Sequence, residues 1–133
     1  MFEIRAYHHA GIRVTDEARA IEFYKHLGFR PEPGCRWPEH RAIALINEGG
    51  LRLNLIYNGE VHPEGHNVLL DEPVKWPGIT HVAFEVPDLQ AVVDRMTERG
   101  VTITEGPLQL DERLICFVRD PDGNVIEFDE VLG

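Results

Sequence analysis

Long apolar runs, paired cysteines and an excess of positive charge are all absent from this chain of 133 residues. No stretch approaches the roughly 20 consecutive apolar residues that a membrane-spanning helix needs. The N-terminus, MFEI, has neither the basic nor the apolar region of an export signal. Only two cysteines occur, Cys35 and Cys116, and neither lies in a metal-binding or disulfide motif. These absences predict a cytoplasmic protein with reduced thiols and no membrane association.

The excess of acidic residues argues against nucleic acids and anionic membranes as partners. Thirteen Lys and Arg residues stand against 23 Asp and Glu residues, which gives a formal net charge of −10 at pH 7. This charge opposes binding to nucleic acid or to an anionic membrane, because both are themselves negative. A length of 133 residues and a hydrophobic content of 43% predict a single globular domain with a real core.

An eight-residue phrase that occurs twice is the most informative feature of the sequence. Residues 9–16, HAGIRVTD, return as residues 81–88, HVAFEVPD, at an offset of 72 residues. Gly28 and Gly100 keep the same offset. Each phrase alternates apolar and polar residues and ends on an Asp, as a strand followed by a helix N-cap does. The repeat predicts two copies of one structural unit, with His9 and His81 at equivalent points.

Both copies show the same predicted order of elements. A strand, a helix with one apolar face and three further strands give βαβββ, so the fold class is α+β with two modules in tandem. The modules are predicted at residues 1–68 and 78–133, with a linker at 69–77. Residues 29–37, which are rich in Pro and Gly, are expected to hold no regular element longer than a short strand, and a polar loop is expected at 105–112, around Gly106-Pro107.

These motifs resemble the vicinal oxygen chelate superfamily, which includes glyoxalase I, extradiol dioxygenases, fosfomycin-resistance proteins and bleomycin-binding proteins. The resemblance rests on the two phrases, on FYKHLGF at 23–29, on EGP at 105–107 and on DPDGNVIE at 120–127. It implies paired βαβββ modules around one divalent ion (Fe, Ni, Zn, Mn or Co) that binds a small substrate through two adjacent oxygens. It also implies a homodimer in which His9 of one subunit joins His81 and Glu127 of the other.

The ligand positions of the superfamily fall on His9, Asn54, His81 and Glu127 of this chain. Bacterial glyoxalase I, which the chain resembles, has a glutamate where Asn54 stands. An amide cannot take up a proton and is a weak ligand for a transition metal. The resemblance therefore implies His9, His81 and Glu127 as metal ligands, with coordination positions left open for substrate. Glu127 and Asn54 are the expected catalytic residues, although Asn54 is equally explained as a loose ligand or a plain polar residue.

The remaining histidines are expected to lie outside the site. His8 should point to the opposite face of the strand that carries His9. His62 and His66 are four residues apart, but Pro and Gly between them disfavour a helix, and a solvated loop is expected.

Two functions remain open at this point. One is a metal-dependent lyase, isomerase or dioxygenase, in which the metal acts as a Lewis acid on a small chelated substrate. The other is a metal-free protein of the bleomycin-resistance type that sequesters a drug or metabolite. The three intact ligand positions favour the enzyme.

Overall fold

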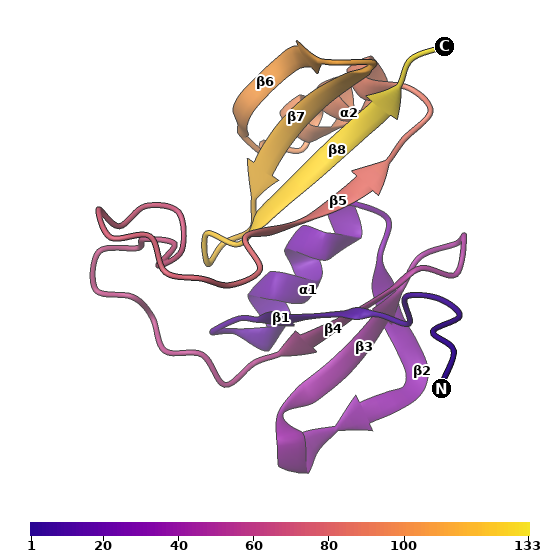
Figure 1. Ribbon diagram of the computed structural model, residues 1–133. Coiled ribbons are helices and arrows are strands. Elements are labelled where there is room, and N and C mark those ends of the chain that lie inside the picture. Colours follow the sequence, from indigo (N-terminus) through magenta and orange to yellow (C-terminus); the bar gives the residue numbers. More distant parts are fainter. The chain divides into compact units, whose positions relative to one another are not determined.

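The computed structural model describes residues 1–133, which form two compact units, residues 1–61 and 62–133. Each unit holds one helix and one four-stranded sheet (Figure 1). The predicted α+β fold of two tandem modules is confirmed. The exact module limits stay a prediction, but residues 62–77 lie within the second unit. There, Asn67 donates a hydrogen bond to the carbonyl of Gly123, and Asp71 pairs with Arg119.

The first unit is built from five main elements in the predicted order. Its sheet has the strand order β1-β4-β3-β2, with β1 parallel to β4 and the other pairs antiparallel. A short 3₁₀ turn, η1 (Pro38–His40), connects the outer hairpin. The bounds are β1 (Ala10–Arg13), α1 (Glu17–His26), β2 (Arg30–Trp37), β3 (Ala42–Ile46) and β4 (Arg52–Ile56).

The second unit repeats this arrangement with the strand order β5-β8-β7-β6. Here β5 is parallel to β8, and β7 is antiparallel to both of its neighbours, β8 and β6. The bounds are β5 (His81–Glu85), α2 (Leu89–Glu98), β6 (Ile103–Leu110), β7 (Arg113–Arg119) and β8 (Val125–Val131).

The two helices begin where the repeated phrases end. Asp16 caps α1 by accepting a hydrogen bond from the backbone N–H of Arg19 at 2.8 Å. Asp88 caps α2 through the N–H of Ala91 at 3.2 Å. Such caps satisfy N–H groups that have no partner within the helix. The local sequence of each phrase is therefore enough to place each helix start.

Alternation along each strand separates a core face from an open face. In β4, Leu53 and Leu55 are fully buried, whereas Arg52 and Asn54 between them are only partly buried. Strand residues point alternately to the two faces of a sheet. The buried set of the first unit includes helix and strand side chains: Ile12, Val14, Ala20, Phe23, Tyr24, Ile43, Leu45, Leu53 and Leu55. The other face is left for polar groups.

The two outer strands are longer than predicted. Residues 29–37 were expected to hold at most a short strand and residues 105–112 to form a loop, but β2 and β6, each of eight residues, run through these segments. Both strands lie at a sheet edge, where a proline has no ladder hydrogen bond to lose. Register shifts interrupt both strands at their Gly-Pro positions, so each strand bends there without ending.

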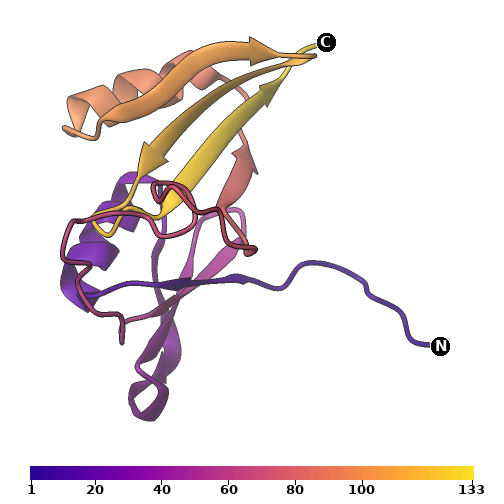
Figure 2. The same ribbon diagram turned by 60° about the vertical axis from the view of Figure 1, so that its left-hand side comes forward.

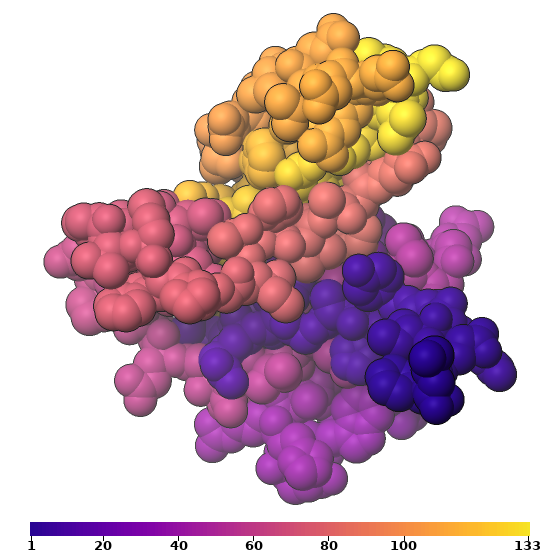
Figure 3. Space-filling model, viewed as in Figure 1, coloured from indigo at the N-terminus to yellow at the C-terminus, as the bar shows by residue number.

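Residues outside the helices and strands are extended or irregular. The segment before β1 runs away from its own sheet (Figure 2) and lies on the surface in the space-filling view (Figure 3). Its apolar side chains Phe2, Ile4 and Tyr7 are exposed. Residues 57–80 contain no helix or strand. None of the helices is both long and apolar enough to span a membrane.

Candidate functional site

In the second unit, two of the predicted ligands lie side by side. His81 is the first residue of the edge strand β5, and Glu127 lies on the neighbouring central strand β8. The Nε2 atom of His81 is 3.2 Å from the Oε1 atom of Glu127. Two donors bound to one tetrahedral zinc ion at 2.0–2.1 Å lie about 3.3 Å apart. The pair therefore has the spacing of two ligands of one metal ion without any rearrangement.

Little positive charge lies close to Glu127 to offset the cost of burying its carboxylate. The residue is only 5% exposed, and its nearest cation besides His81 is Arg113, whose Nη1 lies 4.0 Å from Oε2. Burial, followed by the hydrogen bond and the negative charge of Asp129, raises the pKa of Glu127 to about 7, and Arg113 partly offsets this rise. Arg113 is committed mainly to Asp129, at 2.9 Å. A buried carboxylate of this kind is stabilised by a cation.

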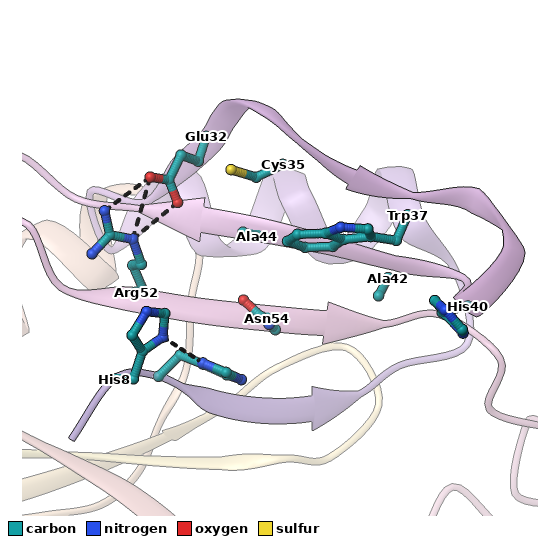
Figure 4. A pocket seen from close by; sticks show the side chains of 10 residues that line it. His8, Glu32, Cys35, Trp37, His40, Ala42, Ala44, Arg52 and Asn54 are labelled. Atoms are coloured by element: carbon teal, nitrogen blue, oxygen red, sulfur yellow. Dashed lines mark hydrogen bonds and ion pairs between the residues drawn. The ribbon is translucent and has the colours of Figure 1, made fainter.

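In the first unit, the open face of the sheet forms a hollow of about 710 Å³. His9 and Asn54, the other two positions implied by the resemblance, both line it. Figure 4 shows Asn54 on β4 below the indole of Trp37, and Cys35 on β2 above it. Ala42 and Ala44 form part of the floor, and their small side chains on β3 leave room above the sheet. The hollow therefore combines an apolar wall with a few polar groups, as small-molecule sites do.

Arg52 and Glu32 close one end of this hollow with a bidentate ion pair. The Nε atom of Arg52 lies 3.0 Å from Oε2 of Glu32, and Nη2 lies 3.0 Å from Oε1 (Figure 4). The Arg52 guanidinium lowers the pKa of Glu32, chiefly through these hydrogen bonds. Since Arg52 is already paired, the hollow presents no free positive charge to an anion. Sequence reasoning missed Glu32 and Cys35 here because it expected no regular element longer than a short strand in their segment.

The expected orientation of His8 is wrong. His8 was expected to point away from the site, but it lines the same hollow as His9. Their Nδ1 atoms are 2.9 Å apart, and their rings meet edge-on at 82°. The alternation rule does not hold at this point, because β1 begins only at Ala10 and the preceding backbone is not part of the sheet. The adjacent histidines in the sequence are the signal that could have found this contact.

The imidazoles of His9 and His81 and the carboxylate of Glu127 are donors of the kind that a divalent ion prefers. No three His, Cys, Asp or Glu side chains are grouped so that they could hold a metal. Imidazole nitrogens and a carboxylate are nevertheless the usual ligands of Zn, Fe, Ni, Mn and Co. His81 and Glu127 have the spacing of two such ligands, and Glu127 is a buried carboxylate that a cation would stabilise.

The second unit contains two other groups of reactive side chains. The rings of His62 and His66 stack with centroids 5.5 Å apart, and Nε2 of His62 lies 3.4 Å from Glu72. The segment is not helical, as predicted, but its histidines interact with each other. Cys116 is buried, and this burial raises the pKa of its thiol to about 11. A thiol in this state is not a nucleophile at neutral pH.

Paired βαβββ units with site residues on their open faces define a glyoxalase-like protein. A sequence profile of the Glyoxalase/Bleomycin resistance protein/Dioxygenase superfamily matches residues 6–128, and the chain belongs to this superfamily. It is 31% identical over 130 residues to the lactoylglutathione lyase of Haemophilus influenzae, an alignment that covers 92% of this chain and 90% of the relative.

Solved structures show the same fold. A glyoxalase/dioxygenase from Nostoc punctiforme superposes with a TM-score of 0.74 at 24% identity, covering 97% of this chain and 92% of the other. TnmS3, an antibiotic binding protein from Streptomyces sp. CB03234, gives a TM-score of 0.69 at 23% identity and covers 98% and 99%. The chain thus resembles a named lyase in sequence and a named binding protein in fold.

Proposed function

We propose that this protein is a divalent-metal-dependent enzyme that acts on a small substrate chelated through two adjacent oxygens. His9, His81 and Glu127 hold the metal, and the hollow over β3 and β4 receives the substrate. The observation that carries the proposal is the 3.2 Å separation of His81 Nε2 and Glu127 Oε1, which matches two ligands of one ion. A bound ion would act as a Lewis acid and stabilise negative charge on the substrate oxygens.

The chain's own residues define the rest of the chemistry. Glu127, with a pKa raised to about 7, can hold or accept a proton near neutral pH. Asn54 cannot, because its amide neither ionises nor accepts a proton. Asn54 instead offers a hydrogen bond to a substrate in the hollow. Isomerase or lyase chemistry of the glyoxalase kind would therefore depend on Glu127 as its base, and dioxygenase chemistry remains within the proposal.

The assembly is proposed to be a homodimer with two equivalent sites, each taking His9 from one subunit and His81 with Glu127 from the other. A closed twofold dimer makes both sites identical. The exposure of Phe2, Ile4 and Tyr7 in the single chain is consistent with a partner surface.

Mixing two inactive variants tests this arrangement. His9→Ala and His81→Ala homodimers should each lack complete sites. Subunit exchange between them restores one intact site in every mixed dimer, so metal binding should partly return. If both variants stay metal-free after exchange, sites are not shared between subunits; if the protein is a monomer that binds one metal, the dimer proposal is wrong.

The function itself is tested by metal analysis of protein purified without chelator, followed by a screen of small substrates. Catechols, α-keto aldehyde–thiol adducts and epoxides represent the three reaction types of the superfamily. We expect about one divalent ion per chain and turnover of one class, lost on metal removal. Metal-free protein that cannot be loaded would contradict the proposal.

A second candidate is a metal-free binding protein. The hollow favours it, because Trp37, Ala42 and Ala44 give an apolar surface suited to a drug-sized molecule. Tight binding of such a ligand by protein without metal, unaffected by His81→Ala, would select this function over the enzyme.

A further inference from the structure

The residue immediately before each proposed histidine ligand contacts the Nδ1 atom of that histidine. In the first unit, Nδ1 of His8 lies 2.9 Å from Nδ1 of His9. In the second unit, Oγ1 of Thr80 lies 2.8 Å from Nδ1 of His81. Residues 8 and 80 are separated by the same 72 positions as the repeated phrases. The contact is thus made twice, by different side chains, at equivalent points of the two units.

This contact decides which ring nitrogen remains for a ligand. Since Nδ1 is engaged in both histidines, only Nε2 is left, and Nε2 is the atom of His81 that faces Glu127 at 3.2 Å. A neutral histidine that binds a metal through Nε2 carries its proton on Nδ1 and must donate it. Thr80 Oγ1 and His8 Nδ1 can both accept that hydrogen bond. Metal-binding histidines generally need such an acceptor, which fixes the tautomer and the ring orientation.

We propose that His8 and Thr80 are paired positioning residues that hold His9 and His81 with Nε2 directed at the metal. This inference rests on the proposed metal site. It assigns to this chain two residues that act on the metal through a neighbouring histidine and do not bind the ion themselves. His8 meets His9 edge-on, with ring centroids 5.1 Å apart, so the ring itself also limits rotation of its neighbour. Thr80 can position His81 only through its hydroxyl group.

Conservative and disruptive substitutions at each position separate the hydrogen bond from simple packing. Thr80→Val keeps the shape and removes the hydroxyl, whereas Thr80→Ser keeps the hydroxyl. His8→Phe keeps an aromatic ring and removes the acceptor. In His8→Asn, the amide oxygen takes the place of Nδ1 as an acceptor.

The test is the affinity of each metal-depleted variant for Zn²⁺, measured by competition with a chromogenic chelator. We expect Thr80→Val and His8→Phe each to weaken binding about 10–100-fold, and Thr80→Ser and His8→Asn to stay within about threefold of the unmodified protein. Nitrogen-15 NMR of the zinc-loaded protein should show both ligand histidines protonated at Nδ1 and metal-bound at Nε2.

Three results would overturn the inference, and they are distinguishable. Unchanged affinity in Thr80→Val and His8→Phe means that the contacts do not position the ligands. Weaker binding in Thr80→Ser and His8→Asn than in Thr80→Val and His8→Phe means that packing, not the hydrogen bond, matters. If the unmodified protein binds no stoichiometric Zn²⁺, the proposed metal site itself fails, and the positioning role fails with it.

Discussion

The two units share one scaffold but differ sharply in charge. Residues 1–61 carry eight basic and eight acidic residues, whereas residues 62–133 carry five basic and 15 acidic ones. The whole net charge of −10 therefore belongs to the second unit. The site shows the same contrast, because the last strand of the first unit carries neutral Asn54 and that of the second carries Glu127. Each unit has a histidine at the equivalent point of its repeated phrase, and only the second has a carboxylate on its last strand at this position.

This contrast assigns different tasks to the two open faces. The first unit has the hollow and its one proposed ligand, His9, with no carboxylate on the central strand. The second unit has a buried carboxylate whose pKa is raised to about 7 and a histidine 3.2 Å away. Residues 54 and 127 thus occupy equivalent register positions in the two sheets but carry different side chains.

The largest expected effect is a loss of metal affinity on substitution of the proposed ligand Glu127, compared with substitution of Asn54. Glu127→Gln keeps the shape of the side chain but removes its charge, so metal affinity should fall by more than about 100-fold, beyond the range of outer-shell changes. Asn54→Ala, the matched change in the first unit, should cost less than about tenfold. Isothermal titration with Zn²⁺ compares them. Equal effects at the two positions would contradict the division of tasks.

Two glycines in equivalent bulged strands should differ in their tolerance of a methyl group. A Cβ at Gly106 in β6 would lie 2.6 Å from the carbonyl oxygen of Ile115, whereas at Gly34 in β2 it would meet nothing within 4 Å. Both have positive φ, 86° and 76°. Gly34→Ala should therefore cost about 1–2 kcal/mol for its conformation alone. Gly106→Ala should cost about 3 kcal/mol, because overpacking adds to this.

Denaturant unfolding measures both free energies. Similar losses in the two variants would mean that β2 and β6 are packed alike.

The metal-free protein should lose stability as pH rises through the range in which Glu127 ionises. Its pKa is about 7 when folded and 4.5 in the reference state, so the folded state binds more protons between these values. The free energy of unfolding then falls as pH rises from about 4.5 to 7, by at most about 3 kcal/mol. Glu127→Gln should remove this dependence. A denaturant series in the presence of EDTA tests it, and an unchanged pH profile in Glu127→Gln would exclude Glu127 as the cause.

The smallest expected change makes the two units more alike. Asn54→Glu supplies a carboxylate on β4 that corresponds to Glu127 on β8, so metal affinity should rise by about tenfold or more. The new ligand fills a position that a substrate needs, and native activity should fall. A glyoxalase-like isomerase activity is expected to appear, because a residue able to accept a proton is restored. Unchanged affinity in a folded variant would mean that residue 54 does not face the metal.

The predictable parts of this fold depend on short sequence patterns. Helices and their caps follow from Asp16 and Asp88 together with one apolar face each, all local features. The full length of the outer strands β2 and β6 could not be found in this way, because their Pro and Gly residues favour loops locally. Their position at a sheet edge, which tolerates those residues, depends on pairing with strands elsewhere in the chain.

The candidate site was predictable only in part for a similar reason. The repeat identified His9 and His81, and the resemblance implied Glu127, since these lie on or beside regular strands. The orientation of His8 depended on where β1 begins, and the pairing of Glu32 with Arg52 depended on the course of β2. Neither is a property of the local sequence.

The central claim is that one ion takes one imidazole from each unit and a carboxylate from the second. X-ray absorption of the zinc-loaded protein tests this most directly, because it counts imidazole ligands at the metal. The predicted spectrum shows two imidazole nitrogens and oxygen ligands at about 2.0–2.2 Å, with one imidazole fewer in His9→Ala and likewise in His81→Ala. Sulfur ligands, or two imidazoles that persist in either variant, would contradict the account.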